Sequence, residues 1–125
     1  MSIEIKNLIN SLGNEALIKE NSPKLVRNKI PQIYSNNNWQ YHVATTNEFH
    51  QYLRKKLLEE VEEFLMDESL DEIADVLEVL DAFAELKNWS ADEVLQAKLN
   101  KTNNRGNFSK RLIATKVTTL EKPAV

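Results

Sequence analysis

Three segments of the chain begin with the residue spacing that starts an α-helix. In each, a Ser or Thr precedes a Glu by three positions, which is the spacing of a capping box, and apolar residues then recur with a helical period; the pairs are Thr45–Glu48, Ser69–Glu72 and Ser90–Glu93. We therefore expect helices over residues 48–67, 70–87 and 90–104. Asn88-Trp89 should end the second helix and Arg105-Gly106 the third, because Asn and Gly tolerate the backbone that follows a helix.

The remaining segments give weaker signals. Residues 1–20 look moderately helical, and residues 24–34 look like a short helix interrupted near Pro31. Two β-prone stretches, 39–44 and 111–117, could pair into one small ribbon. The expected fold is therefore all-α, a helical bundle with a small two-stranded ribbon. A chain of this length fits one domain, here residues 1–125, with a helical extension at 1–20 and a tail at 118–125.

Composition excludes several classes of protein. The chain has 125 residues, a formal net charge of -3, no Cys and two Gly. The lack of Cys excludes disulfides, thiolate zinc sites and cysteine nucleophiles, and two Gly are too few for a glycine-rich phosphate loop. The acidic balance argues against nucleic acid as a partner. No apolar run is long enough for a signal peptide or a membrane span, so we expect a cytoplasmic location and no membrane partner.

The acidic residues of the first two long helices do not form one solvated face. At about 100° per residue, Glu60 lies inside the apolar stripe of the first helix and Glu63 lies at its edge, whereas Glu62 points away. Glu72 and Asp75 lie on the apolar face of the second helix, three positions apart and therefore on one side. Carboxylates on an apolar face are costly unless they are paired or bind a cation. No Lys or Arg of the same helix is placed to neutralise Glu72 and Asp75.

Four carboxylates in one place would raise one another's pKa values unless cations neutralised them. Oxygen ligands favour Mg²⁺, with Mn²⁺ as a substitute, over zinc. No His has the Glu-x-x-His spacing of a di-iron bundle. Two plainer interpretations remain open at this point: the Glu run at 59–63 is an ordinary solvated face, and Glu72 is only the capping partner of Ser69.

These residues resemble the signature of the all-α nucleotide pyrophosphohydrolases of the MazG-like group. That signature is Glu-Glu-x-x-Glu followed by Glu-x-x-Asp, which is found here in EEVEE at 59–63 and EIAD at 72–75. The chain is also similar to a phosphoribosyl-ATP pyrophosphohydrolase-like subgroup, and this likeness covers roughly residues 24–117. It rests on KLVRNKIP (24–31), KLLEEVEEFL (56–65), DEIADVLEVLDAFAEL (71–86) and KTNNRGNF (101–108).

The resemblance implies a Mg²⁺-dependent hydrolase that cleaves the α–β bond of a nucleoside triphosphate and releases a nucleoside monophosphate and pyrophosphate. By position, the metal ligands would be Glu60, Glu63, Glu72 and Asp75. Glu59 and Glu60 would serve catalysis, with Glu59 holding a second ion or orienting the attacking water. The residues expected to contact the substrate phosphates are Lys101, Arg105, Arg27, Lys29 and Lys24.

The chain departs from the family pattern at three points. Asn28 replaces the usual Asp, and Asn107 replaces a usual Gly. Only residues 64–71 separate the two halves of the carboxylate signature, which is shorter than the family generally shows. This short separation predicts a tight turn between the two helices, around residues 67–69.

The oligomeric state and two alternative functions complete the expectations. The family implies a homodimer or a higher homo-oligomer. Independently, the helix at 70–87 is apolar around most of its circumference, so one partner layer cannot cover it, whereas a four-helix arrangement across a two-fold axis could. The alternative functions are a phosphoribosyl-ATP pyrophosphohydrolase and a non-catalytic helical protein that binds metal or a partner.

Overall fold

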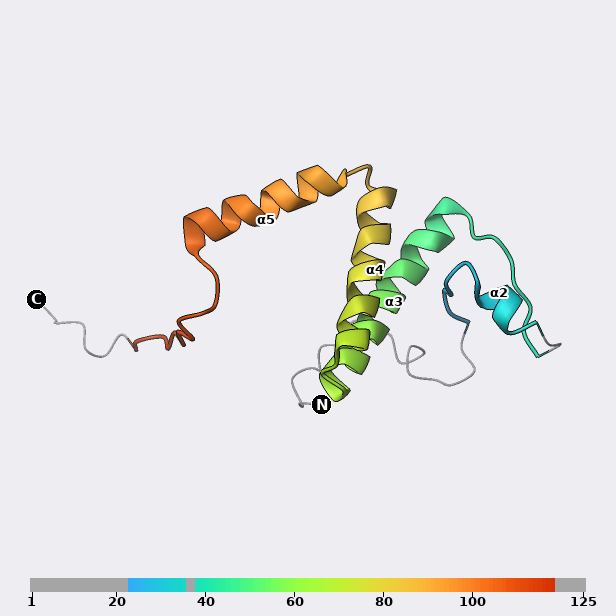
Figure 1. Ribbon diagram of the computed structural model, residues 1–125, viewed down its shortest axis with the longest axis horizontal. Helices are drawn as coiled ribbons and strands as arrows, with labels where there is room; N and C mark the ends of the chain where they lie inside the picture. Colours follow the sequence, from blue (N-terminus) through green and yellow to red (C-terminus); the bar gives the residue numbers. More distant parts are fainter. Residues whose placement is uncertain (1–22, 36–37, 119–125) are drawn as a thin grey trace, which may run out of the picture. The chain divides into compact units, whose positions relative to one another are not determined.

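All regular structure in the described part of the chain is helical (Figure 1). The computed structural model describes residues 23–35 and 38–118, with the helices α2 (Ile30–Ile33), α3 (Thr46–Met66), α4 (Leu70–Leu86) and α5 (Ala91–Arg105). The prediction of an all-α fold is confirmed for these residues. The expected helix at 1–20 and nearly all of the expected tail lie outside them. None of the described helices has both the length and the apolar character needed to cross a membrane.

The chain divides into two compact units, Met1–Ala91 and Asp92–Val125. The second unit contains nearly all of α5, which begins directly after Ser90, as expected. α5 ends where predicted: Gly106 has φ 83°, and its N–H donates to the carbonyl of Thr102 at 2.8 Å.

Two of the predicted capping boxes start the long helices of the first unit. The Thr45 hydroxyl accepts a hydrogen bond from the Glu48 N–H at 3.2 Å, and the Ser69 hydroxyl accepts one from the Glu72 N–H at 3.3 Å. These bonds satisfy N–H groups that have no partner within the helix. α4 ends at Leu86, and Asn88, two residues further on, has a φ of 61°, the left-handed conformation expected of a residue after a helix.

α3 and α4 pack against each other as an antiparallel hairpin (Figure 1). The turn between them is tight, as predicted, and the Ser69 N–H donates to the carbonyl of Asp67 at 2.7 Å. Leu53 is fully buried between the helices and Val79 is 7% exposed. Because the hairpin is antiparallel, residues near the start of α3 face the end of α4, and the end of α3 faces the start of α4.

Two expectations for the flanking segments are wrong. Pro31 does not interrupt a helix but lies in the first turn of α2, where a missing N–H costs nothing. The stretches 39–44 and 111–117 contain no strand. Val43 is 97% exposed and Ile113 is 88% exposed, so neither stretch has the apolar packing that makes a two-stranded ribbon stable.

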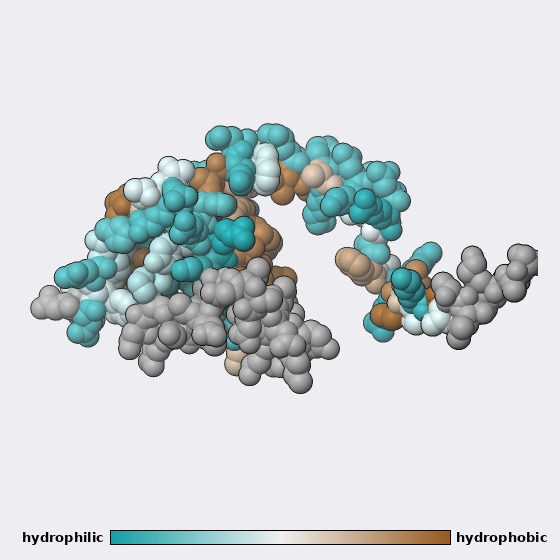
Figure 2. Space-filling view, turned by 180° about the vertical axis from the view of Figure 1, so that it is seen from behind, coloured by the Kyte–Doolittle hydropathy of each residue, from teal (hydrophilic) through white to brown (hydrophobic). Residues whose placement is uncertain are grey.

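The first unit leaves a row of large apolar side chains on α4 uncovered. Leu70, Ile73, Leu77 and Leu80 are all exposed, and their spacing of three, four and three residues places them along one stripe. We call these four residues the α4 stripe. Around the helix it lies roughly opposite the face that packs on α3. Figure 2 shows hydrophobic surface interrupting the hydrophilic surface of this part of the molecule.

Candidate metal centre

Three carboxylates meet between α3 and α4. Glu60 comes from α3, and Glu72 and Asp75 come from α4; one oxygen of each lies within 4.8 Å of the other two. The antiparallel hairpin explains this meeting, because it sets the end of α3 against the start of α4. Glu60 is only 6% exposed, and the two residues of α4 are half-buried. We call Glu60, Glu72 and Asp75 the carboxylate cluster.

Two oxygens of the carboxylate cluster are buried without a hydrogen-bond partner in the part of the chain that the structure describes. They are Oε2 of Glu60 and Oε2 of Glu72. A buried acceptor without a partner is costly, and a charged one more so. Such oxygens fit a cation bound among them, because carboxylates are the preferred protein ligands of divalent cations such as Mg²⁺.

Lys56 partly neutralises the cluster from within α3. Its ammonium group lies 3.3 Å from Oε1 of Glu60 and 3.7 Å from Oε1 of Glu59, and its side chain is only 18% exposed. Glu59, the predicted second-ion or water-orienting residue, is therefore held in an ion pair. Lys56 was not among the predicted site residues, although its spacing of three and four residues from the two Glu residues was a usable signal.

Arg27 contacts the cluster from outside the hairpin. Its Nη2 atom lies 2.6 Å from Oδ1 of Asp75, and the two residues are 48 positions apart. The expectation that no cation neutralises Asp75 was limited to its own helix, and the structure supplies one from another segment. Arg27 was predicted to contact phosphate; in this structure it contacts a predicted metal ligand instead.

Glu63 lies beside the cluster but is not one of its three members. Loss of solvent around its carboxyl group and the neighbouring Glu60 carboxylate raise the pKa of Glu63 to about 7, with further contributions from Glu59 and Glu72. The residue as a whole is exposed, which agrees with its place at the edge of the stripe. Glu62, expected to be solvated, is half-buried instead, and the described contacts do not explain this.

The raised pKa of Glu72 agrees with a surplus of negative charge at the carboxylate cluster. Its pKa is raised by loss of solvent, then by the charges of Asp75 and Glu60, and further by Asp67 and Asp71. A raised carboxyl pKa means that the ionised form is disfavoured where it stands. A bound divalent cation would reverse this, since it favours the ionised form of each ligand.

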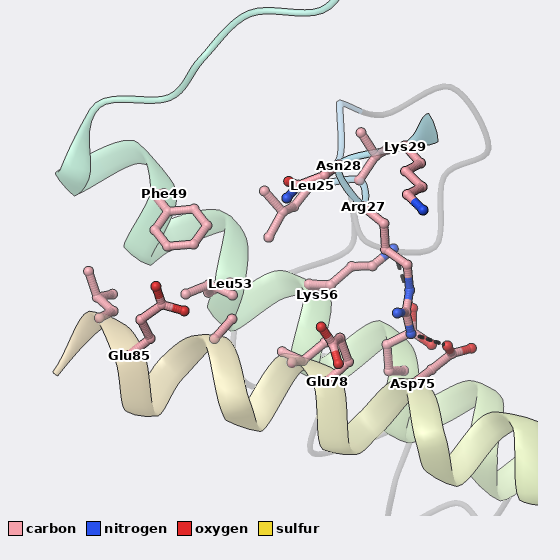
Figure 3. Close-up of a pocket in the computed structure, with 15 residues that line it drawn as sticks. Leu25, Arg27, Asn28, Lys29, Phe49, Leu53, Lys56, Asp75, Glu78 and Glu85 are labelled. Carbon is pink, nitrogen blue, oxygen red and sulfur yellow. Dashed lines mark hydrogen bonds and ion pairs between the residues drawn. The ribbon is translucent and has the colours of Figure 1, made fainter. Parts of the chain in front are cut away.

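A cleft of about 740 Å³ adjoins the carboxylate cluster. It lies between the α3–α4 hairpin and residues 25–29, and its lining includes Glu60 and Asp75 (Figure 3). At one end Phe49 and Glu85 lie close together, while Arg27 reaches Asp75 at the other end. A cleft of this size is in the range of small-molecule sites.

The remaining predicted phosphate contacts are distributed over both units. Lys29 lines the cleft, and Lys24 is exposed in the same segment. Lys101 and Arg105 are exposed residues of α5. Because α5 lies almost wholly in the second unit, a role for these two in the site stays a prediction.

The fold and the cluster define an all-α protein with an acidic site whose ligand set is suited to a divalent cation. Comparisons of the chain with protein-family models, curated proteins and solved structures found no match. The functional conclusion therefore rests on the residues of the cluster and the cleft.

Proposed function

We propose that the chain is a Mg²⁺-dependent nucleoside triphosphate pyrophosphohydrolase, which uses water to break the α–β phosphate bond and releases a nucleoside monophosphate and pyrophosphate. One observation supports this above all others. The two buried oxygens of Glu60 and Glu72 without a partner among the described residues stand beside Asp75, at the end of a cleft lined by carboxylates, cations and apolar side chains. An acidic run on a solvated surface would not leave such oxygens buried.

The donor chemistry fits Mg²⁺ or Mn²⁺. Glu60, Glu72 and Asp75 would hold the ion, and Glu63 at the edge of the cluster is the fourth candidate ligand. When bound, the ion supplies positive charge that neutralises the phosphates and lowers the pKa of a water molecule. Lys56 holds the Glu60 carboxylate in place through its ion pair. Glu59, which is held by the same Lys56, would orient the attacking water or help to hold a second ion.

The cleft has the mixed character that a nucleotide requires. Phe49, Leu53 and Leu86 give it an apolar part that suits a flat base. Arg27, Lys29 and Lys56 give it positive charge suited to phosphates. Asp75 and Glu85 are ten positions apart on α4, so the two ends of the cleft are about 15 Å apart along the helix. An elongated substrate with an aromatic end and a charged end fits this arrangement.

The sequence signature supports the same reaction. The MazG-like pattern has its metal ligands at the three residues of the carboxylate cluster and at Glu63 beside it, and we propose membership of that group, in the subgroup similar to phosphoribosyl-ATP pyrophosphohydrolases. Phosphoribosyl-ATP is accordingly the second substrate to consider. It shares the triphosphate on which the proposed cleavage acts.

Pyrophosphate release from a panel of nucleotides tests the proposal directly. The panel would hold ribo- and deoxyribonucleoside triphosphates and phosphoribosyl-ATP, each with Mg²⁺ and with Mg²⁺ removed by a chelator. We expect Mg²⁺-dependent release of pyrophosphate and a monophosphate from at least one member. Folded protein that binds Mn²⁺ but turns over no nucleotide would replace this proposal with the non-catalytic metal-binding alternative.

We also propose that a second copy of the chain covers the α4 stripe. Its three-four spacing is that of a helix–helix seam, and only two apolar residues of the described chain, Leu53 and Val79, are buried. Helix pairs from two copies would form a four-helix arrangement around a two-fold axis. The cluster faces the other side of α4, so the dimer would leave it open.

Leu77→Lys should convert the dimer to a monomer. Leu77 is 55% exposed within one chain, so a charge there costs little in the monomer but would be buried without a partner in the dimer. Light scattering should report a mass near twice 14.4 kDa for the native chain and near 14.4 kDa for the variant. Asp71→Lys changes the charge at an exposed position of α4 outside the α4 stripe and should leave the mass unchanged. A monomeric native chain would contradict the proposal.

A further inference from the structure

The ion pair between Arg27 and Asp75 joins two groups with different expected roles. Arg27 belongs to the segment over the cleft, and Asp75 belongs to the carboxylate cluster. Their 2.6 Å separation means that the guanidinium already occupies one carboxylate of the cluster. A divalent cation held by the cluster would need the same negative charge. The two cations therefore compete for Asp75.

The ion pair between Arg27 and Asp75 can separate at little cost. The side chains of Arg27 and Asp75 are 55% and 38% exposed, and exposed ion pairs are weak because water screens both charges. Residues 24–29 contain no helix, and among the described residues this is the one ion pair between that segment and the hairpin. Lys56, in contrast, is largely buried beside Glu60. Of the two cations at the cluster, Arg27 is the one that can leave.

The released guanidinium would remain beside the cleft. Residues 25–29 line the same cleft as the cluster (Figure 3). Arg presents several N–H donors in a planar fork that matches phosphate oxygens. An anion held close to a metal at the cluster would thus lie within reach of Arg27 once Asp75 has been given up.

We propose that Arg27 stands in for the metal at Asp75, that a divalent cation displaces it, and that the displaced guanidinium then binds the phosphates of the substrate. The first two steps rest on the proposed metal site and the third on the proposed function. Arg27 would accordingly have opposite effects on the binding of the metal and of the phosphates. It would oppose metal binding when no substrate is present, and it would favour binding of the phosphates when metal is present.

Arg27→Ala tests this with Mn²⁺ as the probe and no nucleotide present. We expect Mn²⁺ to bind about two- to fivefold more tightly than to the native chain, which is the range that an exposed ion pair contributes. Titration calorimetry or the electron paramagnetic resonance signal of free Mn²⁺ measures this. Lys29→Ala is the matched control, because Lys29 lines the same cleft but forms no ion pair with a described residue. It should change Mn²⁺ affinity less than Arg27→Ala does.

The same variants then receive Mn²⁺–triphosphate, with inorganic triphosphate as the phosphate probe. Arg27→Ala should bind this probe about tenfold more weakly than the native chain, since charge-assisted hydrogen bonds to phosphate are lost. If Arg27 only supports the fold, Arg27→Ala should bind both Mn²⁺ and triphosphate more weakly. If Arg27 is only a phosphate contact, Arg27→Ala should leave Mn²⁺ affinity unchanged. Either result would overturn the exchange. If the native chain turns over nucleotides and only the exchange fails, the proposed function stands; if no variant binds Mn²⁺, both proposals fail.

Discussion

Asp75→Asn should lower the rate of nucleotide hydrolysis by on the order of 100-fold while leaving the helical content unchanged. The substitution keeps the shape of the side chain but removes one of three charges that lie within 4.8 Å of one another. Loss of about 3 kcal/mol of metal-dependent stabilisation of the transition state corresponds to a rate lower by on the order of 100-fold. Pyrophosphate release measures the rate, and circular dichroism measures the helical content. The fold should survive, because the one ion pair that Asp75 forms with a described residue is exposed and worth about 1 kcal/mol or less.

Asp81→Asn is the matched control for this experiment. It makes the same chemical change on the same helix, but at an exposed position outside the carboxylate cluster. Its activity should equal that of the native chain. Glu63→Gln is the companion variant: a loss of activity as deep as that of Asp75→Asn would place Glu63 among the ligands. Full activity of both Glu63→Gln and Asp75→Asn would show that the site lies elsewhere.

The helices of the first unit were predictable because their signals are local. Thr45 and Ser69 each bond a backbone N–H three positions later, and such a signal needs only a few consecutive residues. The angular position of the carboxylates is local in the same sense. Once two apolar faces are known to pack together, the carboxylates on those faces must come close. The meeting of Glu60 with Asp75 therefore followed from two helical patterns and one tight turn.

Other features depend on contacts that a local pattern does not contain. Arg27 and Asp75 are 48 positions apart, and nothing in either neighbourhood indicates their pairing. The expected ribbon is absent although its local signal was present. Residues 39–44 and 111–117 have the composition of strands, but a strand is stable only when a partner satisfies its backbone groups. The α4 stripe was predictable only in part. The spacing of its residues can be read from the sequence, but their exposure is known only once the α3–α4 hairpin is known.

Mg²⁺ should stabilise the protein strongly near neutral pH and hardly at all in mild acid. The pKa of Glu63 is raised from 4.5 to about 7 in the folded chain, and that of Glu72 is raised as well. The folded state therefore binds more protons than the unfolded state between these values. Stability from these groups is complete below about pH 4.5 and is lost as the pH rises towards 7. Without metal, the two carboxyl groups thus make the protein less stable at about pH 7.5 than at about pH 5.

A divalent cation takes the place of those protons, so its effect has the opposite dependence on pH. At a Mg²⁺ concentration of about 100 times Kd the gain is about 2.7 kcal/mol, or about 10 °C in Tm for a domain of this size. Thermal unfolding with and without Mg²⁺ at both pH values measures the difference. Other ionisable pairs also respond to pH, but they do so equally in both samples and cancel. Asp75→Asn should lose most of the Mg²⁺-dependent gain, whereas Asp81→Asn should keep it. A gain of equal size at both pH values would show that Mg²⁺ binds away from these carboxylates, since protons would then not compete with it.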